Sequence, residues 1–403
     1  MKGLDQYFLN LNAMPTKYIA RLLTDDSYPK GGTVWEITNE IKPVDLYCYL
    51  YAKYGEPNGL QNFFRHDDSD NLIHWEWVLS GDLGFTTIQG HNFRSEIHLA
   101  GNFGSSKLSL SDFVSQVKLD IGNYGKQISQ LRNKLEKWQQ FLNPYKQISE
   151  AIEQQYRKIE ELKLNLAKDK IPQPTSPSDF KKFKKRWENN ATRYSFAVGL
   201  AYGARAMLPV QAESFINLLL FVLSKPEIKK SERLFQNVLR QPIDIRVQSL
   251  HINCNGFQSP VDYESPQCKA FHTLMNERND LLHGNVDLNK LGIGNVFFKG
   301  KVPIFISYED SWDKTIGVST SLVRLESLND DRIAVKNFIE YLLSLLNPAI
   351  KVQVESIVNK SQLGFNHATG RVGVLFPDHL VDFRAIKGKS KSVLSTSPKL
   401  RQT

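Results

Sequence analysis

The sequence of 403 residues has little cysteine and no long apolar run. Its three cysteines, Cys48, Cys254 and Cys268, are odd in number and widely spaced, which argues against a disulfide framework and a paired zinc site. No apolar run reaches the roughly 18 residues that a membrane-spanning helix needs, and the N-terminus lacks the apolar block of a signal peptide. We therefore expect a cytoplasmic protein that contacts no membrane.

The motifs of several enzyme classes are also missing. The sequence contains no Gly-rich phosphate loop, no nucleophile elbow and no zinc signature, which disfavours an enzyme of small-molecule metabolism. His74, His91 and His98 fall near one another along the chain, but no cysteine or carboxylate accompanies them at a recognised ligand spacing. We expect neither a metal nor a cofactor.

The net charge of +9, from 51 basic and 42 acidic residues, favours anionic partners, and nucleic acid is the commonest of these. Part of the excess lies in one short run of five cations: Lys181, Lys182, Lys184, Lys185 and Arg186. Such a run is typical of an RNA-binding surface and equally of a solvated helix face. The sequence leaves both readings open.

The apolar pattern divides the N-terminal half into three parts. Residues 1–110 predict an α+β domain, with a helix over residues 44–54 that Gly55 ends and strands at residues 72–79, 85–88 and 93–99. Residues 111–170 have helical spacing on both sides of Asn143 and Pro144, which predicts a helical hairpin or coiled coil, serving either as a dimerisation arm or as part of a core. Three prolines in residues 171–179 predict a linker.

Residues 180–350 predict a helical domain. Helices are expected over residues 192–207, 210–223, 231–239, 267–283 and 330–346, with a β-hairpin around Lys299, Gly300 and Lys301. Residues 351–386 contain short strand-like pieces, and residues 387–403 predict a basic, disordered tail. The expected fold class is mainly α, with an α+β N-terminal region.

The helix over residues 267–283 carries an arginine where an apolar residue is expected. Arg278 continues the stripe of Phe271, Leu274 and Met275, and a buried guanidinium is costly unless it is paired or binds an anion. Asn279 and His283 are four residues apart, so they share a face on which the amide can orient the imidazole. Because glycine favours a helix C-terminus, Gly284 places His283 in the last turn.

The run Arg278-Asn279-Asp280-Leu281-Leu282-His283 resembles the signature of HEPN-domain ribonucleases, and the resemblance extends over about residues 180–350. It implies an HEPN-like bundle and metal-independent endoribonuclease activity, in which the ribose 2′-hydroxyl attacks the adjacent phosphate. Arg278, Asn279 and His283 are then the catalytic residues. Family members generally act as homodimers with facing motifs, often as toxins or antiviral effectors, so we also expect an inhibitory or triggering protein partner.

A second segment supports the resemblance. Residues 212–217 resemble the first core helix of family members, which makes Glu213 a candidate partner behind the catalytic residues. Arg246 and His251 repeat the spacing of Arg278 and His283, but they lack the polar neighbour and the capping glycine, and we interpret them as structural.

Two alternatives remain at this point. The chain could be a non-catalytic RNA-binding protein, with aromatic residues beside the basic run available for stacking, or a scaffold that binds no RNA. If the motif is structural, Arg278 is expected to pair with a carboxylate such as Glu213, and His283 is an ordinary capping residue at a helix end.

Overall fold

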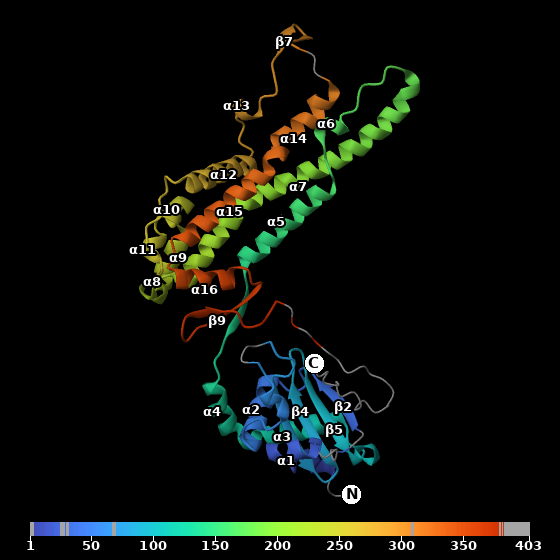
Figure 1. Cartoon of the computed structure of the whole chain (residues 1–403), viewed down its shortest axis with the longest axis vertical. Coiled ribbons are helices and arrows are strands. Elements are labelled where there is room, and N and C mark those ends of the chain that lie inside the picture. The colour runs from blue at the N-terminus through green and yellow to red at the C-terminus, as the bar shows by residue number, and fades with distance from the viewer. Residues whose placement is uncertain are drawn as a thin grey trace, which may run out of the picture. The chain divides into compact units, whose positions relative to one another are not determined.

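The computed structural model describes residues 4–24, 29, 32–66, 70–307, 310–378, 380 and 382, so the expected basic tail at residues 387–403 lies outside the described residues (Figure 1). The chain forms two compact units. The first comprises Met1–Gln139, Asn366–Gly370 and Val374–Thr403, and the second comprises Gln140–Phe365 and Arg371–Gly373. The boundary near residue 140 differs from the linker that the sequence predicted at residues 171–179.

The first unit is built on a five-stranded antiparallel sheet. The strands are β1 (Asn12–Ala13), β2 (Gly32–Ile37), β3 (Trp75–Gly81), β4 (Gly84–Gly90) and β5 (Ser95–Gly101), in the order β1-β3-β4-β5-β2. Trp77, Ile88 and Ile97 lie opposite one another on adjacent strands, and all three are buried. The helices are α1 (Thr16–Thr24), α2 (Pro43–Tyr54), α3 (Leu110–Ile121) and α4 (Gly125–Lys134), with short 3-10 turns between elements. The predicted α+β region is confirmed.

The sequence located α2 and three strands closely. Pro43 occupies the first turn of α2, where its missing N–H is not needed, and Gly55 follows the helix at φ +78°, in the left-handed region that favours glycine. The expected strands at residues 72–79, 85–88 and 93–99 overlap β3, β4 and β5.

Residues 111–170 do not form one helical hairpin. Phe113 and Val117 of α3 and Ile128 of α4 are buried in the core of the first unit, whereas Ile152 and Tyr156 of α5 (Pro144–Glu161) are buried in the core of the second. Between them, β6 (Gln139–Leu142) joins β9 (Gln362–Asn366) and β10 (Arg371–Gly373) in a three-stranded sheet. The apolar face of α3 and α4 and the apolar face of α5 therefore pack in different cores. Apolar periodicity shows that a helix has a buried face but does not show which core buries it.

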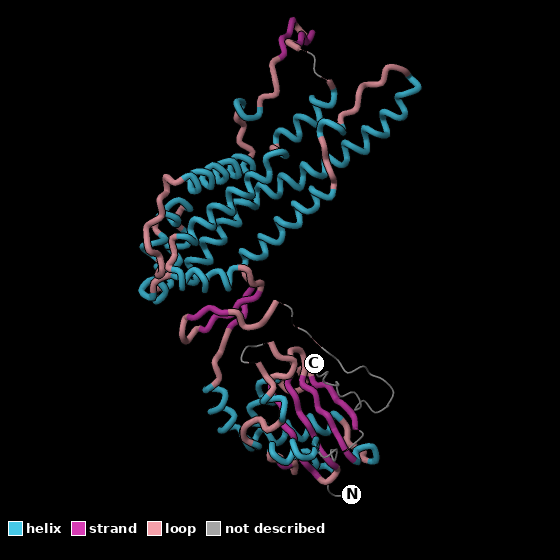
Figure 2. Tube along the Cα trace, viewed as in Figure 1, coloured by secondary structure: helices cyan, strands magenta, loops and turns pink. Residues whose placement is uncertain are grey.

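The second unit is a bundle of long helices, which lie side by side in Figure 2. Its main helices are α5, α7 (Pro177–Leu223), α12 (Pro266–His283) and α15 (Leu328–Ser344), and α7 packs against the other three. Shorter elements complete it: α6 (Leu166–Asp169), α8 (Pro226–Lys230), α9 (Glu232–Arg240), α10 (Ile243–Gln248), α11 (Leu250–Asn253), α13 (Leu288–Leu291), β7 (Val296–Lys299), β8 (Val302–Phe305), α14 (Val318–Leu322) and α16 (Pro348–Val358). The predicted hairpin around Gly300 is confirmed as β7 and β8.

Helix α7 runs for 47 residues through positions where the sequence predicted breaks. Pro209 lies inside it and is buried, and the fully buried Leu208, Ala212 and Phe215 hold the helix together across the proline. The helix begins at Pro177, so the proline-rich segment is a turn within the second unit rather than a linker between domains. Ile171, at its start, is buried with Tyr194 of α7.

By length and composition α7 also meets the criteria for a membrane span, because one 18-residue window has a mean hydropathy of 1.7. Half of that window is buried inside the protein. Phe215, Leu219 and Leu220 are fully buried in the bundle core, as the residues of a central helix are.

Candidate active site

Helix α12 carries the Arg278 motif, and both of its ends are defined by local contacts. At the start, the Ser265 hydroxyl accepts from the backbone N–H of Cys268, and Pro266 occupies the first turn. At the end, Gly284 adopts φ +60° and ψ +37°, and its N–H bonds to the carbonyl of Asp280. The expected helix and its glycine cap are confirmed, and His283 lies in the last turn.

The packing of α12 fixes which face points out of the bundle. Phe271 stacks on Phe338 of α15, with ring centroids 4.2 Å apart, and Leu274 and Met275 are buried beside it. The Tyr202 hydroxyl of α7 donates to the Leu281 carbonyl at 2.9 Å. The C-terminal turn of α12 is therefore attached to α7.

Arg278 is half-buried and keeps unused hydrogen-bond donors. Its Nη1 donates to the Asn279 side-chain oxygen at 3.0 Å, while its Nε is buried without a hydrogen-bond partner. Within the described residues, Arg278 forms no ion pair. A guanidinium left in this state is suited to an anionic ligand, because an unsatisfied buried donor is costly in the free protein.

His283 is exposed, and the described residues offer its imidazole no hydrogen bond. The sequence led us to expect that Asn279 orients it, but the Asn279 oxygen accepts from Arg278 instead. Arg278 and His283 are separated by about 7.5 Å of helix rise and about 140° around the axis, so they flank one edge of α12 rather than share a face.

Glu213 contacts Arg246, the arginine of the second pair, Arg246 and His251, that has the same spacing. It forms its ion pair with Arg246 of α10, which also donates to Asn217 at 2.6 Å, and Arg246 is 6% exposed. Glu213 is thus bonded away from Arg278, contrary to the role that the resemblance suggested. The buried link between α7 and α10 agrees with our interpretation of Arg246 as a structural residue.

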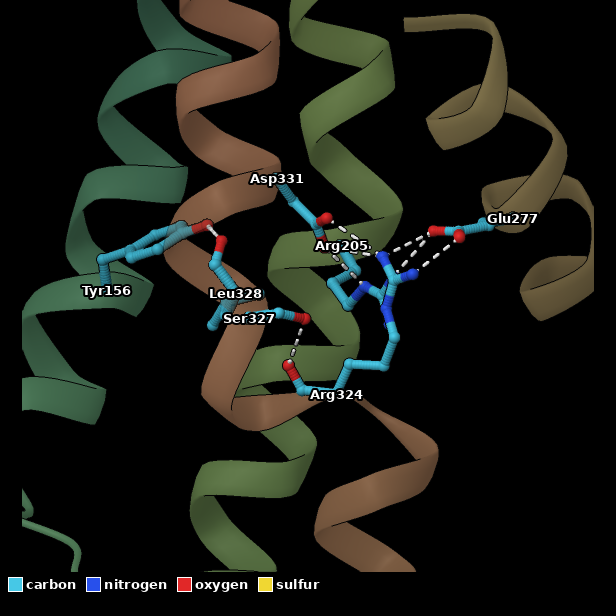
Figure 3. Close-up of polar contacts among 7 residues, drawn as sticks. All are labelled: Tyr156, Arg205, Glu277, Arg324, Ser327, Leu328 and Asp331. Atoms are coloured by element: carbon cyan, nitrogen blue, oxygen red, sulfur yellow. Dashed lines mark hydrogen bonds and ion pairs between the residues drawn. The ribbon is translucent and has the colours of Figure 1, made fainter. Parts of the chain in front are cut away.

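A four-residue ionic network supports α12 next to Arg278, and the sequence analysis missed it (Figure 3). Arg205 of α7 contacts Glu277 at 2.8 Å and Asp331 of α15 at 3.0 Å. Arg324 contacts the same two carboxylates, at 2.7 Å and 3.0 Å. No periodicity signals this network, because its members come from three helices and a turn.

The network borders a cleft of about 1080 Å³ between α12, α14 and α7. The lining includes three arginines, Arg205, Arg278 and Arg324, against five carboxylates: Glu277, Asp280, Asp287, Asp313 and Asp331. His283 is not among the lining residues. Carboxylates therefore outnumber arginines in the lining, although Lys170 pairs with Asp313 at 2.7 Å, and Arg278 is the lining cation without a carboxylate partner among the described residues.

The basic run lies at the N-terminal end of α7. Lys181, Lys182, Lys184, Lys185 and Arg186 are all exposed, and Lys184 contacts Glu188 at 3.9 Å. Arg186 precedes Tyr202, which bonds to the last turn of α12, by 16 residues of continuous helix, or about 24 Å at 1.5 Å per residue. The five cations of α7 and the motif of α12 therefore lie on two helices that pack against each other, well apart along α7.

Comparisons with protein-family models, with curated proteins and with solved structures find no match to this chain. Within the part of the chain that the structure describes, no group of three or more His, Cys, Asp or Glu side chains could hold a metal ion.

Proposed function

We propose that this protein is an endoribonuclease of HEPN type that cleaves RNA without a metal ion. The observation that carries the proposal is the end of α12, where a glycine-capped last turn presents an exposed His283 beside an Arg278 that no carboxylate neutralises within the described residues. A wholly structural role for Arg278 predicted a carboxylate partner, and the candidate partner Glu213 is bonded to Arg246 instead.

The proposed reaction is an internal transfer. The ribose 2′-oxygen attacks phosphorus and gives up its proton to a base, the bond to the 5′-oxygen breaks, and that oxygen receives a proton from an acid. The products are a 2′,3′-cyclic phosphate and a 5′-hydroxyl end. His283 moves protons, the Arg278 fork stabilises the charge on phosphate, and Asn279 positions the guanidinium through the bond to its Nη1.

One copy of the motif offers one imidazole, whereas the reaction uses both a base and an acid. A homodimer with facing α12 ends supplies two imidazoles and two guanidiniums around one phosphate. RNA outside the site is held by the basic end of α7, where Arg186 lies about 24 Å along the helix from Tyr202. In the cell we place such an activity in toxin or antiviral-defence systems, held in check or triggered by a protein partner.

The test is incubation of the wild-type protein, His283→Ala and Arg278→Gln with total cellular RNA in EDTA, followed by mapping of fragment ends. The matched control is His272→Ala, since His272 is exposed on the same helix and its Nδ1 lies 3.2 Å from the Tyr263 hydroxyl. We expect 2′,3′-cyclic ends from wild type and from the control. His283→Ala and Arg278→Gln should each lose at least about 100-fold, the scale for a lost acid or base and for a lost charge-stabilising donor, respectively.

The non-catalytic alternative gives a different pattern in the same samples. If all four proteins bind RNA equally in a filter assay and none cleaves it, the nuclease proposal fails and RNA binding alone is left. If His272→Ala and His283→Ala lose activity equally, the assignment of His283 fails even though cleavage is real.

A further inference from the structure

The strongest unexplained feature of the second unit is an apolar arm that directly follows α12. The arm comprises residues 288–307, which contain α13, β7 and β8; Figure 1 shows its hairpin beyond the end of the helical bundle, where the Lys314 ammonium lies 4.8 Å from the centre of the Phe305 ring. Among the described residues, none from the arm belongs to a hydrophobic core of the protein. Its exposed large apolar residues are Leu288, Leu291, Ile293, Val296, Phe297, Phe298, Val302, Ile304, Phe305 and Ile306.

Both faces of the hairpin are apolar. Val296 lies opposite Phe305 on one face, and Phe297 lies opposite Ile304 on the other. Phe298 is 67% exposed. A two-stranded hairpin alone is marginally stable in water, and a contiguous exposed apolar surface of this kind marks an interaction site. A binding partner is therefore needed to cover the arm.

Charge identifies the kind of partner. Residues 288–307 contain three lysines, Lys290, Lys299 and Lys301, and no acidic residue. A surface that receives the arm should accordingly combine apolar side chains with an excess of carboxylates.

The cleft beside α12 has this composition. Its apolar lining includes Leu208, Leu274 and Leu322, and its carboxylates outnumber its arginines by five to three. The arm's own base, Leu291 and Ile293, forms part of the rim of that cleft. A cleft of about 1080 Å³ is large enough to take several side chains of the hairpin tip.

We propose that the arm of one copy of this chain docks in the cleft of a second copy, and that the second copy returns the same contact. Complementary charge and apolar character are present on one chain, so a two-fold axis satisfies both arms and both clefts at once. Because α12 lines the cleft and leads into the arm, the exchange brings the α12 ends of the two copies together. The proposal needs the second copy, but it does not depend on RNA cleavage.

The first experiment measures the oligomeric state of the full chain by sedimentation over a range of concentrations, without RNA. The arm variant is Phe297→Ser with Phe298→Ser, and the cleft variant is Leu322→Arg, at a residue that is 53% exposed and so replaceable without loss of the fold. The control is Val352→Ser on α16, which is equally apolar and exposed. We expect dimers of wild type and control, with the dissociation constant raised at least about tenfold in both other variants.

A second experiment identifies the contact directly. Chains carrying only Phe298→Cys are mixed with chains carrying only Leu322→Cys and oxidised, and the native cysteines do not interfere because all three are buried. A disulfide between the two different chains supports arm exchange. Disulfides only between two Phe298→Cys chains, or a disulfide that forms only within a chain carrying both changes, overturn it.

The remaining outcomes also separate the two proposals. A wild-type protein that stays monomeric at high concentration overturns the arm proposal and assigns the apolar arm to another molecule, whether or not RNA is cleaved. A dimer that depends on the arm but cleaves no RNA supports the arm proposal and contradicts only the nuclease proposal.

Discussion

Replacing Asp331 with alanine tests whether the ionic network behind Arg278 stabilises the helical unit. The Asp331 side chain is 9% exposed, and it accepts from Arg205 and Arg324 at 3.0 Å each. Removing one member of a buried ion pair costs about 3–5 kcal/mol, because the remaining charge stays desolvated. Arg205 keeps its contact with Glu277, so we expect the lower end of that range, about 3 kcal/mol.

The matched control is Asp330→Ala. Asp330 is the adjacent residue in the same first turn of α15, but it is exposed and its side chain forms no hydrogen bond or ion pair among the described residues. Its loss removes only the favourable interaction of an acidic side chain with the helix N-terminus, about 0.3–1 kcal/mol. Each variant removes one negative charge, so the difference between their free energies of unfolding isolates the contribution of the buried network.

Calorimetry of thermal unfolding measures the change in the Tm of the helical unit that each variant causes. For a unit of roughly 230 residues, 1 kcal/mol corresponds to about 2–4 °C, so Asp331→Ala should lower the Tm of the helical unit by about 6–12 °C. Asp330→Ala should lower it by no more than about 4 °C. Equal shifts in the two variants would refute the reasoning, because they would mean that the buried contacts contribute no more than an exposed charge.

Three further predictions concern other parts of the chain. Arg324 has φ +44°, a strained conformation for a non-glycine residue, so Arg324→Gly should be more stable than Arg324→Ala by about 1 kcal/mol in denaturant unfolding. Burial alone would raise the pKa of Asp120, but hydrogen bonds from Lys53, Tyr49 and Asn123 outweigh it and lower the pKa. The stability that Asp120 contributes is therefore present above about pH 4 and lost as the pH falls through the lower folded pKa, and Asp120→Asn should flatten acid unfolding of the first unit. The third change replaces all five cations of the α7 run with glutamine: Lys181, Lys182, Lys184, Lys185 and Arg186. If each contacts one phosphate, the slope of log binding constant against log salt concentration should fall by up to about 3.5. Glutamine at Lys336 and Lys351 is the control, and the run has no RNA-binding role if the variant and the control have the same slope.

The sequence predicted those elements whose signals are local. Gly55 ends α2, Gly284 ends α12, and the hairpin around Gly300 forms where its turn residues predict it. Proline was misread in α7, because a buried proline is tolerated when surrounding apolar contacts hold the helix, and those contacts are invisible in the sequence. The same limit explains why residues 111–170 were assigned to one hairpin although they serve two cores.

The partners of charged residues were the least predictable part of the site. Spacing correctly placed Arg278 and His283 at the end of a helix, but Glu213, which the resemblance suggested as a partner behind them, forms its ion pair with Arg246. Ion pairs between helices depend on how the helices are rotated against each other, and a single sequence does not record that rotation. Arg205, Glu277, Arg324 and Asp331 illustrate the point, since each looks like an ordinary surface charge until the three helices and the turn meet.

The distribution of charge around α12 bears on how RNA could approach the site. The carboxylate-rich cleft beside Arg278 should repel a phosphate backbone, whereas the five cations of α7 should attract it, and the nearest of them, Arg186, lies about 24 Å along the helix from Tyr202. RNA is therefore expected to follow the outer surface of α7 to the exposed His283 and not to enter the cleft. An acidic cleft left free of RNA is available to the lysine-bearing arm of a second copy, so the two proposals assign the cleft and the exposed His283 to different ligands.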